Sequence, residues 1–105
     1  MSYVQTTFKI QGIDVPCSGL YRSNTSIVRY QLSIRSLNYN GPAKVIVRNG
    51  INGIPILTTN VTLVGNTASV MGNVTVGPTS RQLVGEVYIN EIMVGICYVS
   101  LIRKY

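Results

Sequence analysis

Hydrophobic and polar residues alternate along most of this chain, and the alternation divides it into short segments. Residues 26–36 show the pattern best. One face of this segment carries Val28, Tyr30, Leu32 and Ile34, and the other carries Arg29, Gln31, Ser33 and Arg35. A period of two residues is typical of a β-strand with one buried face. We therefore expect the first set to point into a core.

The same period predicts strands on both sides of this segment. Residues 2–10 place four residues on one face, namely Val4, Thr6, Phe8 and Ile10. Residues 43–48 direct Ala43, Val45 and Val47 inward. Further strands are predicted at residues 54–58, 59–64, 67–76, 82–90 and 92–102.

Turn residues between these segments predict how the strands are joined. Asn49-Gly50 is typical of a tight hairpin, because both residues tolerate a positive φ. Pro55 has no N–H to donate to a neighbouring strand, which restricts residues 54–58 to the edge of a sheet or to a bulge.

Two more turns complete the predicted order. Gly65-Asn66 is expected to join residues 59–64 and 67–76 as a pair, and a turn near Asn90 is expected to join the last two strands. Short strands at roughly ten-residue spacing, with no helical period, are typical of all-β folds. We expect residues 1–105 to form a single antiparallel β-sandwich domain of 7–9 strands, immunoglobulin-like or jelly-roll in topology. A small closed barrel is the alternative.

The last predicted strand, residues 92–102, is apolar on both faces. One face carries Ile92, Val94, Ile96, Tyr98 and Ile102, and the other carries Met93, Cys97, Val99 and Leu101. An antiparallel sheet normally has one solvated face, so such a strand should be covered on both sides. Either it crosses between two packed layers of its own domain, or another subunit covers it.

Composition favours the second explanation. Charged residues make up 11% of the chain, and hydrophobic residues 46%. An ordinary soluble domain has about 25% charged residues. The low charge indicates that part of the surface is covered by other copies of the chain or by structural partners. We therefore assign Met93, Cys97, Val99 and Leu101 to a predicted subunit interface.

The charge balance is strongly basic, with nine Lys and Arg residues against three acids and a formal net charge of +6. Such a balance favours anionic partners, including nucleic acid. Arg29 and Arg35 share one strand face, and Lys44 and Arg48 are expected to continue the stripe on the next strand, forming an anion-binding surface. Stacking platforms for bases would come from Tyr21, Tyr30, Tyr39 and Tyr88. The alternative is that these charges only keep the surface soluble.

No catalytic constellation is visible in the sequence. The chain has no histidine, which is the commonest general base and metal ligand. Glu86 and Glu91 are expected to be solvated side chains at a hairpin. No phosphate-binding loop, calcium loop or zinc spacing occurs. We expect no enzyme activity, no catalytic residue, no metal site and no cofactor.

Two cysteines lie far apart in the sequence, Cys17 and Cys97. They are either two buried thiols or a disulfide, and a disulfide would indicate an oxidising environment. Three glycosylation sequons begin at Asn24, Asn60 and Asn73. The longest apolar run, residues 92–99, is too short to span a membrane.

Several stretches of the chain are rich in Ile, Val, Tyr, Asn and Thr and poor in acids, as in VTLVGNTASVMGNVTVG. The ends, MSYVQTTFKI and MVGICYVSLIRKY, are strand-like, and no leader is recognised. In these features the chain resembles small β-sandwich structural proteins of thermophilic archaea and their viruses, including filament and capsid-associated subunits. Its three Asn-Gly steps depart from a thermophilic composition.

The resemblance implies a homo-oligomeric structural protein whose neighbouring copies exchange strands. Residues 2–10 would then be the exchanged strand, which adds Val4, Thr6, Phe8 and Ile10 to the predicted interface. We expect a self-assembling subunit of a virion or an extracellular filament, with a cytoplasmic location as the alternative. The alternative function is a β-domain that binds nucleic acid or another anionic ligand.

Overall fold

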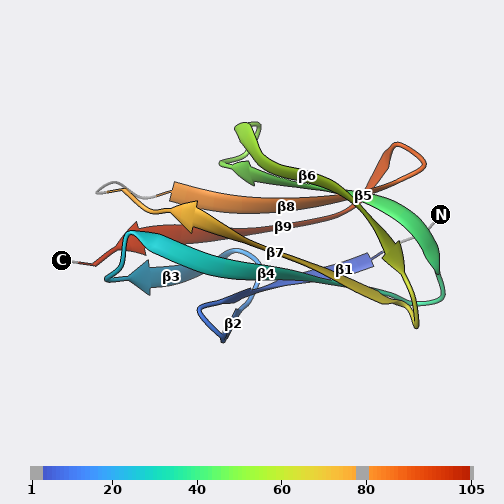
Figure 1. Ribbon diagram of the computed structural model, residues 1–105, viewed down its shortest axis with the longest axis horizontal. Helices are drawn as coiled ribbons and strands as arrows, with labels where there is room; N and C mark the ends of the chain where they lie inside the picture. Colours follow the sequence, from blue (N-terminus) through green and yellow to red (C-terminus); the bar gives the residue numbers. More distant parts are fainter. Residues whose placement is uncertain (1–3, 78–80, 105) are drawn as a thin grey trace.

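Nine β-strands make up the fold in the computed structural model, which describes residues 4–77 and 81–104 (Figure 1). In chain order the strands are β1 (Val4–Ile10), β2 (Ile13–Val15), β3 (Gly19–Ser23), β4 (Ile27–Ser36), β5 (Gly41–Asn49), β6 (Ile54–Leu63), β7 (Thr67–Thr75), β8 (Arg81–Ile89) and β9 (Ile92–Arg103). No helix able to cross a membrane occurs within these two ranges. The all-β prediction is confirmed, and residues 2 and 3 of the first predicted strand lie outside the described residues.

The strands form two sheets that pack face to face. One sheet has the order β2-β1-β4-β7, and the other has the order β3-β9-β8-β5-β6. Neighbouring strands are antiparallel except β3 and β9, which run parallel. Strands β1, β4 and β7 against β5, β8 and β9 follow the immunoglobulin-like order, which is one of the two predicted sandwich topologies.

The core between the sheets is built from the predicted inward faces. Val4, Thr6, Phe8 and Ile10 of β1 are buried, as are Val28, Tyr30, Leu32 and Ile34 of β4 and Ala43, Val45 and Val47 of β5. Phe8 packs edge-on against Tyr30, with 6.0 Å between ring centroids. At Gly85 of β8 a Cβ atom would come within 2.8 Å of Leu32, so a glycine is needed for the two sheets to approach this closely.

The β6–β7 connection corrects one prediction. Gly65 and Asn66 do form a tight turn, with φ values of 61° and 67°. Beyond a single bridge between Val64 and Thr67, however, β6 pairs with β5 and β7 pairs with β4, in different sheets. The predicted pairing of residues 59–64 with 67–76 is therefore wrong. Turn chemistry is the same at a hairpin and at a corner where the chain changes sheets, so the sequence pattern does not separate them.

The strand predicted as two pieces, 54–58 and 59–64, is the single strand β6. It is the edge strand of its sheet, with a register shift where Arg48 faces Pro55, as the missing N–H of Pro55 requires. The loop before it holds four residues, because Asn49 pairs with Ile54. The expected tight turn at Asn49-Gly50 is thus a longer hairpin loop.

Strand β9 also departs from the expected alternation. Val87 pairs with Gly95 and Tyr88 with Met93, so Val94 is an extra residue in a bulge. The bulge turns Val94 toward the core and Met93 toward solvent, which reverses their predicted faces. Beyond the bulge the inward face is buried, but Met93 is 47% exposed and Ile96 45% exposed. The first half of this strand is therefore open on one face in the single chain, and its coverage by another subunit stays a prediction.

Candidate functional site

Most of the predicted interface residues lie in the protein's own core. Strand β1 pairs with β4 along its whole length and with β2 over its last three residues, so Val4, Thr6, Phe8 and Ile10 pack within the same chain. Cys97, Val99 and Leu101 of β9 are fully buried as well. Of the predicted set only Met93 is exposed. These assignments are corrected, because the inward face of a sandwich strand is covered by the opposite sheet.

A groove between β1 and β9 brings a few of these residues together. It has a volume of about 670 Å³ and is lined by Val4, Thr6, Met93 and Cys17, among others. It lies where β2 and β3 no longer cover the edges of β1 and β9.

Cys17 and Cys97 form a disulfide with a Cα–Cα distance of 5.0 Å. Of the two states that the sequence left open, the structure has the bridge. Cys17 lies in the connection between β2 and β3, which are the edge strands of the two sheets on one side of the sandwich. The bridge ties this connection to β9 and closes a sequence separation of 80 residues. In the chain-entropy model such a crosslink stabilises the fold by roughly 4 kcal/mol.

The four basic residues predicted to form one stripe are divided between the two sheets. Arg29 and Arg35 lie on the exposed face of β4, whereas Lys44 and Arg48 lie on β5 in the opposite sheet. The continuous anion-binding stripe is therefore wrong. Tyr30, one of the proposed stacking residues, is buried in the core, and its burial raises the pKa of its hydroxyl.

Glu86 is buried in an ion pair, which corrects the expectation of a solvated side chain. It is 7% exposed and accepts hydrogen bonds from Arg48 Nε at 2.9 Å and from the Tyr88 hydroxyl at 3.0 Å. Arg48 Nη1 also donates to the Gly53 carbonyl oxygen at 3.1 Å, which holds the loop that leads into β6. Glu91, by contrast, is exposed at the β8–β9 turn.

Two pKa shifts follow from this network. The hydrogen bond to Glu86 raises the pKa of Arg48. Desolvation, followed by the hydrogen bond to Glu86, raises the pKa of Tyr88. The ammonium group of Lys44 lies 5.5 Å from the centroid of the Tyr88 ring, so Tyr88 packs between a cation and a carboxylate rather than offering a free stacking face.

The most unusual surface of the protein is the side formed by β6 and β7. These strands are the last of their sheets on the same side of the sandwich, and they span ten and nine residues. The sequence from residue 49 to residue 80 contains no charged residue at all. Exposed apolar side chains accompany these strands, with Ile54 80%, Val64 73% and Met71 67% exposed.

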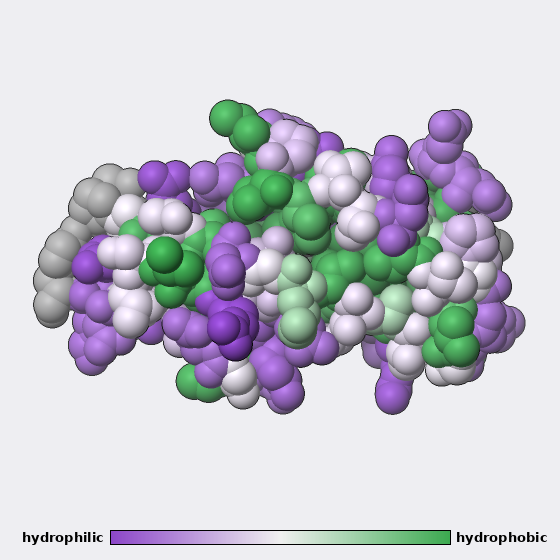
Figure 2. All heavy atoms as spheres, in the orientation of Figure 1, coloured by the Kyte–Doolittle hydropathy of each residue, from purple (hydrophilic) through white to green (hydrophobic). Residues whose placement is uncertain are grey.

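Figure 2 shows hydrophobic residues gathered across the middle of the visible face, with hydrophilic residues toward both ends. Strands β6 and β7 cross this region in Figure 1. Natural sheets usually protect a free edge with charged residues or proline, since an open edge can pair with another chain. On β6 the only such residue is Pro55 near its start, and β7 has none. We call residues 54–75 the uncharged side.

The corner between β6 and β7 is held firmly in place. Asn66 donates its backbone N–H to Asn40 Oδ1 at 2.7 Å, and Asn40 Nδ2 donates to Asn66 Oδ1 at 2.8 Å. Ser36 donates its backbone N–H to the Asn66 carbonyl oxygen at 2.8 Å. These bonds tie the corner to the end of β4 and to the β4–β5 connection. The end of β6 and the start of β7 are therefore held in place.

The sequons are all exposed. Asn60 lies on β6 and Asn73 on β7, and Asn24 lies between β3 and β4. A glycan at Asn60 or Asn73 would stand beside an open edge.

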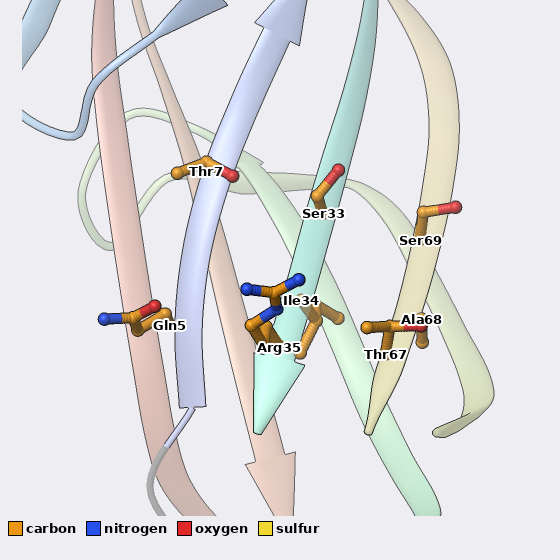
Figure 3. A pocket seen from close by; sticks show the side chains of 8 residues that line it. All are labelled: Gln5, Thr7, Ser33, Ile34, Arg35, Thr67, Ala68 and Ser69. Carbon is orange, nitrogen blue, oxygen red and sulfur yellow. The ribbon is translucent and has the colours of Figure 1, made fainter. Parts of the chain in front are cut away.

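A shallow hollow lies on the outer face of the β1-β4-β7 sheet (Figure 3). Its volume is about 500 Å³, and it is lined by Gln5, Thr7, Ser33, Ile34, Arg35, Thr67, Ala68 and Ser69. Arg29 is not part of it.

Over residues 4–77 and 81–104, no three His, Cys, Asp or Glu residues cluster in a way that could hold a metal ion. No family model matches the chain, and a search of curated proteins finds no match. The uncharged side is the feature that the sequence reasoning missed. Its signal is simple, because Arg48 and Arg81 are consecutive charged residues separated by 32 uncharged ones.

Proposed function

We propose that this protein is a structural subunit that assembles with copies of itself through its uncharged side. The observation that carries the proposal is that β6 and β7 are both long, both without charge and, among the described residues, both without a partner at their outer edge. Each outer edge presents a row of backbone N–H and C=O groups, and strand addition satisfies such groups by extending the sheet.

Electrostatics supports this side as the point of contact. Each copy carries a formal net charge of +6, so two copies repel one another through most of their surfaces. The uncharged side allows two copies to approach without facing basic residues directly. The repulsion that remains acts over longer distances and is screened by salt, since the Debye length at physiological ionic strength is about 8 Å.

A second copy is the partner that fits both edges. A twofold axis beside the uncharged side places β6 next to β6 of the other copy and β7 next to its β7, each antiparallel. Both sheets then continue from one copy into the next, and the contact is self-complementary, as in most homo-oligomers. This arrangement needs no exchange of β1, which already pairs with two strands of its own chain.

The disulfide supports a setting outside the reducing cytosol, because disulfides persist in oxidising compartments and on virion surfaces. We therefore assign the assembly to a virion or an extracellular filament. The sandwich has one side that is crosslinked by the disulfide and one side with open strand edges, and this combination suits a subunit that assembles with copies of itself.

Single lysines on the open edges test the proposal. Thr62→Lys places a charge on β6 and Ser69→Lys places one on β7, both at exposed positions. Ser33→Lys is the matched control, because Ser33 is the register partner of Ser69 on β4, which is paired on both sides. Sedimentation velocity over a range of concentrations measures the assembly, and circular dichroism verifies the fold.

We expect wild type and Ser33→Lys to form oligomers, and the two edge variants to shift toward monomer by at least tenfold in dissociation constant, since charge on an edge strand opposes pairing. A wild-type protein that stays monomeric at millimolar concentration contradicts the proposal. Equal weakening by Ser33→Lys also contradicts it, because the added charge alone would then explain the loss.

A further inference from the structure

The hollow on the outer face of the β1-β4-β7 sheet has an ordered arrangement of polar groups. Gln5, Arg35 and Thr67 are register partners across the three strands and form one row. Thr7, Ser33 and Ser69 form the adjacent row in the same way. Successive outward residues of a strand are about 7 Å apart, so the two rows lie within reach of one small ligand.

Among the described residues that line the hollow, Arg35 is the only one with a charged side chain. In the part of the chain that the structure describes, the two ion pairs are Lys9 with Asp14 and Arg48 with Glu86. The guanidinium of Arg35 therefore has no carboxylate partner among the described residues, whereas that of Arg48 is neutralised. The hollow combines one available cation with four hydroxyl groups, those of Thr7, Ser33, Thr67 and Ser69, and the amide of Gln5.

Figure 3 shows how these groups are arranged. Arg35 lies between β1 and β4, and its guanidinium is directed toward the level of Thr7 and Ser33. Gln5 lies beside it on β1, and Ser69 lies on β7 at the level of Ser33. A ligand in the hollow meets the guanidinium at one end and the hydroxyl row at the other.

We propose that this hollow binds an oxyanion, with Arg35 holding the negatively charged group and Thr7, Ser33 and Ser69 contacting its neighbouring oxygens. A guanidinium offers planar, paired N–H donors that match carboxylate, sulfate and phosphate oxygens, and the charge strengthens these hydrogen bonds. Hydroxyl groups both donate and accept, so they suit the hydroxyls that flank the charged group of an acidic sugar. The absence of any acid among the lining residues removes the usual repulsion against an anion.

This site uses the outer face of the sheet, including three residues of β7, whereas the proposed assembly uses the outer backbone edge of β7. Strand addition at β7 would leave the outer face of β4 open. The two proposals can therefore fail separately.

An NMR titration of the full chain tests the site, with chemical shifts followed at each backbone amide. Inorganic sulfate, glucuronate and glucose are the three probes. Sulfate and glucuronate share the oxyanion, and glucose has the hydroxyls of glucuronate without its carboxylate. We expect sulfate or glucuronate to shift the amides of Thr7, Ser33 and Ser69, and glucose to shift none of them.

The matched variants are Arg35→Ala and Arg29→Ala, which remove the same charge from the same face of β4, one inside the hollow and one outside it. We expect Arg35→Ala to weaken binding by about tenfold, the loss of one charge-assisted hydrogen bond, and Arg29→Ala to change it less than twofold.

Stronger binding of glucuronate than of sulfate assigns the ligand to acidic sugars, and the reverse assigns it to bare oxyanions. The proposal is overturned if neither anion shifts these amides, or if both arginine variants weaken binding equally, because nonspecific attraction to a basic protein would then suffice.

Discussion

The two sides of the sandwich are built in opposite ways. On one side the edge strands are β2 and β3, which have three and five residues, and a disulfide ties the connection between them to β9. On the other side the edge strands are β6 and β7, which have ten and nine residues and no charge. The first side divides its open edge among short pieces of four strands, because β2 and β3 cover only part of β1 and β9, whereas the second side presents the full length of two strands.

In the assembly that we propose, this difference lets copies of a basic chain meet on a side without charge. Lys9, Asp14 and Arg22 are on β1, β2 and β3, and every other strand except β6 and β7 also carries at least one charged residue. The chain thus concentrates stability on one side and leaves the other free for contact.

The largest effect is expected from removing the bridge that closes the β2–β3 side. The double variant Cys17→Ser/Cys97→Ser should lose roughly 4 kcal/mol of unfolding free energy, since an 80-residue separation is no longer crosslinked in the unfolded chain. Urea unfolding measures the loss. Reduction of wild type should reproduce it, and reduction should leave the variant unchanged. An unchanged free energy of unfolding in the double variant would show that the disulfide does not stabilise the β2–β3 side.

A smaller loss is expected from the ion pair that anchors the start of β6. Glu86→Ala removes the acceptor of both Arg48 and Tyr88, and we expect a loss of about 2 kcal/mol, typical of hydrogen bonds to a charged group. Glu91→Ala is the control, because Glu91 is exposed at a turn. Urea unfolding of the two variants compares them directly, and equal losses would remove the role assigned to Glu86.

Alkaline pH should weaken the fold by an amount that depends on two tyrosines. Burial raises the pKa of Tyr30 above its ordinary value of 10.0, and desolvation with the Glu86 hydrogen bond raises that of Tyr88. A raised pKa means that the folded state holds the neutral phenol more tightly than the unfolded state does. The resulting stability is present below pH 10 and is lost as pH rises through the folded-state pKa.

The measurement is urea unfolding between pH 8 and pH 11, together with ultraviolet absorption of tyrosinate. Tyr30→Phe should flatten the alkaline loss, because it removes the most buried of these hydroxyls. The Tyr30 hydroxyl lies against Gly72 of β7, where a Cβ atom would be 2.6 Å away, so its ionisation should loosen the uncharged side first. The same slope in wild type and Tyr30→Phe would contradict this assignment.

The smallest effect on stability is expected from the edge lysines. Ser69→Lys should change the unfolding free energy by less than about 0.5 kcal/mol when measured on dilute protein, as is usual for surface positions. Thermal unfolding of Ser69→Lys and Ser33→Lys at low concentration checks this. A large loss in Ser69→Lys alone would mean that β7 is a structural strand that tolerates no charge, and the assembly test would need another position.

The sequence pattern predicted the inward faces of β1, β4 and β5 correctly because alternation is local and is kept through most of these strands. The pattern failed where the position of a residue depends on contacts with residues far away in the sequence. The buried state of Glu86 depends on Arg48, which lies 38 residues away. The bulge at Val94 and the change of sheet at Gly65-Asn66 have no local signature that separates them from a regular strand and a hairpin.

For the candidate site, too, local features could be predicted from the sequence, whereas features that depend on distant strands could not. Basic residues on consecutive strands cannot be assigned to one face until the sheet of each strand is known, and β4 and β5 lie in different sheets. The uncharged run between Arg48 and Arg81 is fully visible in the sequence. Its importance becomes visible only in the fold, because the two strands within this run, β6 and β7, are both edge strands.

Amide hydrogen exchange at two protein concentrations is the most direct measurement of edge-to-edge assembly. In dilute solution the outward amides of β6 and β7 should exchange rapidly, like those of any free edge. At high concentration we expect protection to rise along residues 54–63 and 67–75, while β2 and β3 stay unchanged. Protection that rises only on β2, β3 or the groove between β1 and β9, or that does not change with concentration anywhere, would contradict it.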